Sequence, residues 1–358
     1  MNTTRLNKIL DNLREKNLKQ MIICDPSTIF YITNVWIHPG ERMLALLIDV
    51  DKPPVLFVNR LFIVPNDIGI EVVFFYDHED GIEYLCKYTD SNAIIGVDKL
   101  WPAKFLLHFL ELKGAISCCD SSICADKARM IKDKNEQELM INASLLNDEC
   151  MAKFQDLLYE GVTEFEVSEK IKSIFKENGA SDVSFSPIVG FGANAADGHH
   201  SPDDTKLKKG DCVVLDVGCI KEGYCSDMTR TVFFDHVSDK HREIYELVKK
   251  ANEEAEKIIK PGVRFCDIDK VARDVISKAG YGVNFNHRLG HCIGFECHEA
   301  GDVSGVNTEC VSEGMIFSIE PGIYLTDEMG VRIEDLVLVT HDGYVKLNHF
   351  SKELIVVK

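Results

Sequence analysis

The chain has 358 residues, of which 45% are apolar and 27% charged, an ordinary globular composition that is long enough for two domains. Its formal net charge of -18, without any Lys/Arg cluster, excludes nucleic-acid binding, because such binding neutralises phosphates with cations. No apolar run approaches the roughly 20 residues of a membrane span, and residues 1–12 lack a secretory signal, so we expect a cytoplasmic protein with no membrane partner. The 13 cysteines show no paired CxxC zinc spacing and are expected as free thiols.

Residues 1–125 predict a small N-terminal α/β domain. An amphipathic helix is expected over 3–19, and a short strand over 21–24 that stops at Asp25-Pro26. Further strands are predicted at 44–50, 55–58, 72–75 and 94–97, with helices near 82–88 and 103–112.

Residues 126–358 predict a second domain of α+β character. Long helices are expected at about 134–158 and 163–178, the second with Thr163 as its N-cap and Gly179 as its stop. A loop rich in Gly, Pro and His follows over 187–205, and then strands at 212–219 and 229–234 and a helix at about 239–259.

This second domain repeats itself at an offset of about 101 residues. The stretch from Leu157 to Gly179 matches the stretch from Ile258 to Gly280 in its apolar pattern and its glycines. Either two amphipathic helices are similar by chance, or the domain has two related halves. In the second case a site built from both halves is expected where they meet.

Five potential metal ligands stand in strand-like or loop contexts of this domain. Asp216 and Asp227 are 11 residues apart across a predicted hairpin with Gly223 in its turn, and Glu320 and Glu334 are 14 apart across a second one. Each acid alone is more often solvated or capped, but carboxylates brought close together repel unless cations hold them. Together with His291, the four carboxylates suit two divalent ions, namely manganese, cobalt, zinc or iron(II), rather than calcium.

In their order and spacing these segments resemble the pita-bread metallopeptidases, the family of prolidase, Xaa-Pro aminopeptidase and methionine aminopeptidase. The matching blocks between about 129 and 358 are NAA through His199, LDVGC with SDMTRT, HRLGHCIG with ECHE, SIEPGIY and VRIED. A weaker match to the family's small, creatinase-like domain lies at Ile29–Thr33 and Pro39–Arg42. The resemblance implies a pita-bread catalytic domain with pseudo-twofold internal symmetry.

The resemblance also implies roles for individual residues. Asp216 would bind one metal, His291 and Glu320 the other, and Asp227 and Glu334 both, with a bridging hydroxide as the nucleophile. Glu320 would move the proton, and His199 and His298 would contact the substrate carbonyl and the oxyanion. His287 and Arg332 are expected to line the substrate pocket, Arg332 also by fixing a carboxylate, although His287 could simply brace its turn.

The chain departs from the family pattern at a few positions. Cys292 replaces a glycine and is expected as a packed thiol or, alternatively, a crowding group or additional ligand. Asp197-Gly198 replaces Leu-Pro and should loosen the loop before His199. Cys297 in place of an aliphatic residue is expected to be a minor change, and His200 is expected to be a passenger, a residue without a role of its own beside His199.

The function implied is hydrolysis of the Xaa-Pro bond at the N-terminus of dipeptides or other short proline-containing peptides, with manganese as the expected metal. The small domain would form a homodimer and restrict access to the active site. Two alternatives remain: a metal-dependent amidohydrolase with a non-proline or non-peptide substrate, and a binding protein on an inactive peptidase fold. The second is disfavoured because all five ligand types are present.

Overall fold

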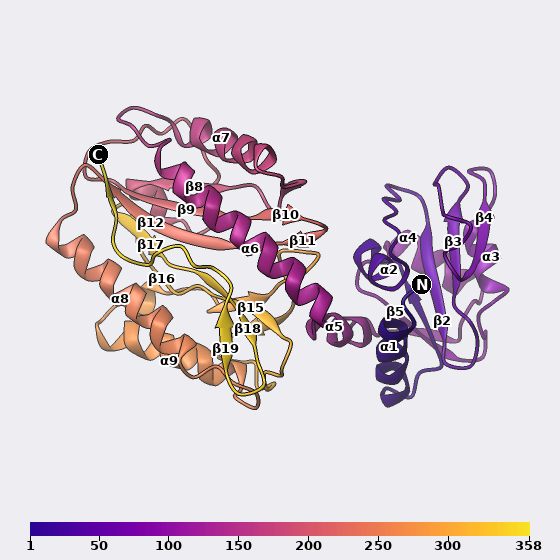
Figure 1. Ribbon diagram of the computed structural model, residues 1–358. Helices are drawn as coiled ribbons and strands as arrows, with labels where there is room; N and C mark the ends of the chain where they lie inside the picture. Colours follow the sequence, from indigo (N-terminus) through magenta and orange to yellow (C-terminus); the bar gives the residue numbers. More distant parts are fainter. The chain divides into compact units, whose positions relative to one another are not determined.

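The computed structural model describes residues 1–358, which form two compact units, Met1–Arg129 and Met130–Lys358 (Figure 1). The division falls near the end of helix α5 (Ser122–Met130), whereas the sequence places it after residue 125. None of the helices combines the length and apolarity needed to cross a lipid bilayer.

The first unit is built on a six-stranded sheet in the order β4-β3-β2-β1-β5-β6. The β1–β2 and β2–β3 pairs are antiparallel, and the remaining three pairs are parallel. The strands are β1 (Gln20–Ile23), β2 (Leu44–Asp49), β3 (Val55–Asn59), β4 (Glu71–Phe75), β5 (Ile94–Val97) and β6 (Ser117–Asp120), and the helices besides α5 are α1 (Thr3–Glu15), α2 (Pro26–Thr33), α3 (Gly81–Cys86) and α4 (Ala103–Glu111).

Helix α2 is absent from the sequence prediction. Asp25-Pro26 ends β1 as expected, but it also begins a helix: the Asp25 carboxylate accepts from the backbone N–H groups of Ser27 and Thr28, and Pro26 occupies the first turn. The predicted helix over 3–19 is shorter than expected, because Asn17 adopts a left-handed conformation with φ of 56°.

The second unit combines sheets of four, five, three and two strands. Their orders are β20-β12-β9-β8, β14-β13-β15-β18-β19, β11-β10-β7 and β16-β17. The strands are β7 (Asp182–Val183), β8 (Ile188–Phe191), β9 (Cys212–Val217), β10 (Cys219–Lys221), β11 (Tyr224–Cys225), β12 (Met228–Phe234), β13 (Gly290–Cys292), β14 (Glu299–Val303), β15 (Ile316–Ile319), β16 (Gly322–Leu325), β17 (Met329–Arg332), β18 (Asp335–Val339), β19 (Tyr344–Lys346) and β20 (Val356–Val357).

Four helices cover these sheets: α6 (Lys134–Gln155), α7 (Glu164–Glu177), α8 (Asp239–Glu256) and α9 (Phe265–Lys278). Figure 1 shows α7 and the α8–α9 pair on opposite sides of the strands. Two short 3-10 segments, η1 (Gly192–Ala196) and η2 (Gly282–Asn284), precede β9 and β13. Thr163 caps α7 as predicted, in a capping box with Glu166.

The internal repeat is present in the fold. Helix α9 begins and ends 101 residues after α7, and the backbone connection that precedes each helix is the same. The N–H of Gly161 donates to Leu207 and the N–H of Gly262 donates to Val311, both at 2.9 Å. The two halves therefore have one backbone plan, which is the pseudo-twofold symmetry expected of a pita-bread domain.

Candidate metal centre

All nine predicted site residues line one cavity of the second unit, with a volume of about 540 Å³. They come from both halves of the repeat: Asp216 and Asp227 from the first, and His291, His298, Glu320, Arg332 and Glu334 from the second, with His199 and His287 on loops. Other lining residues include Phe185, Ile188 and Pro202.

Two hairpins bring the four carboxylates together. Strands β9 and β12 are antiparallel, with Asp216 inside β9 and Asp227 directly before β12. The predicted turn at Gly223 is confirmed, since Glu222 and Gly223 both have positive φ and join β10 to β11. The second hairpin is also confirmed: β16 and β17 pair antiparallel, with Glu320 just before and Glu334 just after them.

Side-chain hydroxyls orient two of the carboxylates. Thr229 donates to Glu334 Oε2 at 2.7 Å, and Ser318 donates to Glu320 Oε1 at 3.0 Å. Ser318 also accepts from the backbone N–H of His291. These hydroxyls hold the acids in place without supplying the positive charge that buried carboxylates need.

His291 presents a lone pair to these acids. Its Nδ1 lies 3.1 Å from the carbonyl of Cys292, to which it donates, so Nε2 is the unprotonated nitrogen of the neutral ring. Nε2 faces Glu320 Oε1 at 3.4 Å and Asp227 Oδ2 at 3.7 Å. Burial lowers the pKa of His291 to about 3, so the imidazole ring stays neutral and does not carry a second proton toward these acids.

The donor set fits divalent cations. Three buried carboxylate oxygens, one each on Asp216, Asp227 and Glu334, have no hydrogen-bond partner. Burial, followed by the charges of neighbouring acids, raises the pKa of Asp227 and Glu334 well above their usual values. Burial also raises the pKa of Glu320 to about 7 against the opposing charge of Arg332. Unpartnered oxygens and crowded acids are the arrangement that a bound cation compensates.

Arg332 places a guanidinium against these acids. It donates to Asp216 Oδ2 at 2.7 Å, to Thr229, to the hydroxyl of Tyr324 and to the carbonyl of Gly198. Tyr324 lies 3.0 Å from His287 Nε2, whose ring is kept neutral because burial lowers the pKa of His287 to about 4. Arg332 and His287 are thus joined through Tyr324, a residue that the sequence analysis did not single out.

The loop carrying His199 is fixed rather than loose, contrary to expectation. Asp197 accepts from the backbone N–H of His199, and the Gly198 carbonyl binds Arg332. His200 is not a passenger, because its Nε2 lies 2.6 Å from the fully buried carboxylate of Glu164.

Glu164 is the anchor of this loop. Its oxygens accept from the N–H groups of Phe191 and Asp203 and from the side chain of Asn194. One signal for this role is present in the sequence, an acid in the first turn of a helix, but such acids are ordinarily solvated. Its role depends on a loop about 30 residues away in the chain.

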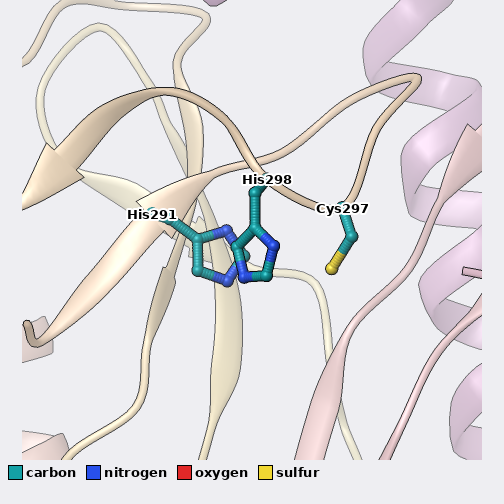
Figure 2. Close-up of side chains that lie close together, drawn as sticks. All are labelled: His291, Cys297 and His298. Carbon is teal, nitrogen blue, oxygen red and sulfur yellow. The ribbon is translucent and has the colours of Figure 1, made fainter. Parts of the chain in front are cut away.

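The two cysteine departures have different surroundings. Cys292 is fully buried in the core cluster that also contains Met130, and its sulfur lies beside Gly301, as expected of a packed thiol. Cys297 lines the cavity, and its thiol donates to Asp227 Oδ2 at 3.2 Å. Figure 2 shows Cys297 and His298 projecting from one loop beside His291, whose ring lies 4.2 Å from that of His298. Cys297 therefore contacts a predicted metal ligand, which an aliphatic side chain at this position could not hydrogen-bond.

Comparison with known proteins gives two family matches. Residues 138–341 match the model of metallopeptidase family M24, and residues 5–131 match the creatinase/prolidase N-terminal domain. An uncharacterized peptidase of Staphylococcus aureus strain USA300 is 38% identical over 354 residues, covering 98% of this chain and all of the relative.

Solved structures agree with these matches. A recombinant prolidase from Thermococcus sibiricus superposes with a TM-score of 0.93 at 33% identity, covering 99% of both chains. An Xaa-Pro dipeptidase from Bacillus anthracis superposes with a TM-score of 0.91 at 27% identity, again covering 99% of both.

Proposed function

The chain belongs to metallopeptidase family M24, and from this premise we propose that it hydrolyses the Xaa-Pro bond at the N-terminus of dipeptides or short peptides. The observation that carries the proposal is the convergence of Asp216, Asp227, His291, Glu320 and Glu334 on one cavity. The similarity to a prolidase and an Xaa-Pro dipeptidase over nearly the whole chain supports the choice of substrate.

We assign two divalent ions, manganese first, to these five residues. Asp216 would hold one ion, His291 and Glu320 the other, and Asp227 and Glu334 would be shared. When bound, the ions would supply Lewis acidity, lowering the pKa of a water molecule from about 15.7 toward about 7 and polarising the scissile carbonyl.

The chain's own residues handle protons and developing charge. Glu320, whose carboxylate is held by Ser318, would receive the proton of the attacking water and pass it to the leaving nitrogen. His199 and His298 line the same cavity and would donate hydrogen bonds to the carbonyl oxygen as it becomes negative. Arg332, through Asp216 and Tyr324, and His287, through Tyr324, would keep the wall of the substrate pocket in position.

The cavity also offers surfaces that suit proline. The apolar side chains of Phe185, Ile188 and Pro202 line this cavity and would pack against a pyrrolidine ring. We further assign homodimer formation and restriction of access to the first unit, which matches the creatinase/prolidase N-terminal model. Sedimentation of the whole chain as a monomer would contradict the dimer.

A panel of three peptides tests the function. The purified protein, with manganese added, is incubated with Ala-Pro, Ala-Pro-Ala and Met-Ala-Ala, and metal content is measured in parallel. Cleavage of Ala-Pro indicates a dipeptidase, and cleavage of the tripeptide Ala-Pro-Ala alone indicates an aminopeptidase. Metal-loaded protein that cleaves neither proline peptide would contradict the proposal. Cleavage of Met-Ala-Ala alone would then indicate an aminopeptidase that does not require proline, and cleavage of none of the three would favour an amidohydrolase with another substrate or a binding protein on an inactive fold.

A further inference from the structure

The cavity contains one cysteine whose surroundings are those of a metal ligand. We infer that Cys297 supplies a sulfur ligand to the metal centre, so that the cavity binds thiophilic divalent ions such as Zn²⁺ and Cd²⁺ through a mixed oxygen, nitrogen and sulfur set. This inference rests on the metal centre of the proposed function. It adds a ligand that the five predicted residues do not include.

The position of the sulfur agrees with shared coordination. Cys297 Sγ lies 3.2 Å from Asp227 Oδ2. Two such atoms bound to one ion at about 2.3 Å and 2.1 Å would lie roughly 3.1 to 3.6 Å apart for bond angles between octahedral and tetrahedral. The observed separation therefore accommodates a cation in place of the thiol proton.

Neighbouring donors point to the same place. One donor atom from each of His291, Cys297 and His298 lies within 4.8 Å of the others, and Figure 2 shows the three side chains together. Asp227 and Glu334, both almost fully buried, each retain a carboxylate oxygen without any partner in this cavity. Cys297 thus stands among several buried donors and is not an isolated thiol.

The loop that carries Cys297 is held firmly. Glu299 accepts from the N–H of Phe295 and forms an ion pair of 3.1 Å with Lys132, in which both side chains are buried. The Gly294 carbonyl accepts from Cys225 at 2.8 Å. These contacts hold the backbone on both sides of Cys297 before any metal arrives, which lowers the cost of ordering the ligand.

Binding at this thiol is a simple exchange. The S–H bond breaks, its proton passes to solvent, and the sulfur electron pair forms the bond to the cation. Soft sulfur favours Zn²⁺ and Cd²⁺ over Mn²⁺, whereas the four carboxylates favour harder ions. The sulfur should therefore shift the selectivity of the centre without removing its affinity for manganese.

Cobalt spectroscopy distinguishes a Cys297 sulfur that binds the metal from one that only lies near it. Co²⁺ is titrated into the wild-type protein and into the variants Cys297→Ser, Cys297→Val and Cys292→Ala, the last removing the thiol that points into the core. We expect an intense near-ultraviolet thiolate-to-cobalt band in the wild type and in Cys292→Ala. We expect both Cys297 variants to lack the band while binding the same amount of cobalt, and their preference for Cd²⁺ over Mn²⁺ to fall at least about tenfold.

Two results would overturn the inference in distinguishable ways. If all four proteins bind cobalt with the same spectrum, Cys297 is not a ligand, but the metal centre stands. If cobalt binds the wild type no better than it binds Asp227→Asn, both the sulfur ligand and the proposed metal centre fail. Cys297→Ser preserves the size and polarity of the side chain, so its result decides the matter if Cys297→Val does not fold.

Discussion

The two halves of the second unit have the same backbone but use one equivalent position in opposite ways. Helix α7 begins with Glu164 and helix α9 begins with Phe265, and both side chains are fully buried. Glu164 binds the loop of His199, whereas the ring of Phe265 packs against Phe317 with centroids 5.4 Å apart. A repeated backbone thus supports a polar anchor in one half and an apolar core in the other.

This difference indicates what each half contributes. In the first half, the buried carboxylate of Glu164 holds a loop in position through hydrogen bonds. Without these hydrogen bonds, burial of the carboxylate would cost free energy. The second half uses the equivalent space for packing, and its polar residues His291, Glu320 and Glu334 face the cavity instead. The proposed metal centre takes residues from both halves, and the loop of His199 is held by Glu164 of the first half and, at the Gly198 carbonyl, by Arg332 of the second.

Removal of a shared ligand from either half should have the largest effect. Asp227→Asn and Glu334→Gln each remove one negative charge from the centre, and each should lower metal content and reduce kcat by more than about 10³-fold. Metal analysis and Ala-Pro hydrolysis measure both effects. Asp274→Asn, an exposed acid paired with Lys270, is the control and should match the wild type. Full activity in a metal-free Asp227→Asn protein would refute the assignment.

The next largest effect concerns an ion pair between the halves. Arg230 of β12 is buried and lies 2.7 Å from Asp335 of β18, and it also donates to the carbonyl of Glu334. Arg230→Met removes a positive charge that is paired with the buried carboxylate of Asp335. The loss should lower the free energy of unfolding by about 3–5 kcal/mol. Urea unfolding measures this change.

An exposed pair serves as the control for that variant. Arg264→Met removes an ion pair with Asp267 on the surface, worth about 1 kcal/mol or less. Equal losses of stability in Arg230→Met and Arg264→Met would show that the two halves do not depend on the buried pair.

Substitutions at the first residues of α7 and α9 should affect different properties, turnover in one case and stability in the other. Glu164→Gln weakens the anchor of the His199 loop and should reduce kcat by about 10²-fold through misplacement of that histidine, with metal content unchanged. Phe265→Leu should lower the free energy of unfolding by about 1–2 kcal/mol and leave kcat near its wild-type value. Steady-state kinetics and urea unfolding on both variants give the comparison.

Glu169→Gln, an exposed acid on the same helix α7, is the matched control for Glu164→Gln and should behave as the wild type. Loss of metal from Glu164→Gln would mean that the loop supports the ligands themselves, and the contrast between the halves would then be wrong.

The smallest expected effect is the loss of stability on replacing an equivalent glycine in each half, and it should be the same in both halves. Gly161 and Gly262 have φ of 90° and 88° and open space around them, so the backbone conformation alone demands glycine. Alanine at either position should cost about 1–2 kcal/mol, and Gly343→Ala, where φ is not positive, should change stability by less than about 0.5 kcal/mol. Clearly unequal costs for Gly161→Ala and Gly262→Ala would break the equivalence of the halves.

The sequence predicted those features that depend on local patterns. Thr163 as a helix cap, Gly223 in a turn and the two ligand hairpins follow from the preferences of short segments, and the structure confirms them. The family resemblance supplied the fold, which the comparisons confirm. The roles of individual site residues remain predictions that the variants above test.

Other features depend on contacts between distant segments, and the sequence did not reveal them. The partners of Glu164 lie 27 to 39 residues away, and Tyr324 meets His287 across 37 residues. The loop that carries Cys297 is held at Glu299 by Lys132, which lies 167 positions away in the chain. No periodicity encodes such contacts, because they are set by how the halves pack.

Strand β20 has a consequence for how the protein is made. Val356 and Val357 pair in parallel with Phe233 and Phe234, and Arg230 donates to the carbonyl of Ser351, 121 positions later. During synthesis, the strands of the first half therefore leave the ribosome long before residues 350–357, which complete their sheet. During that interval the edge of β12 that later pairs with β20 has no partner, and an unpaired edge is a place where a strand of another chain can add to the sheet.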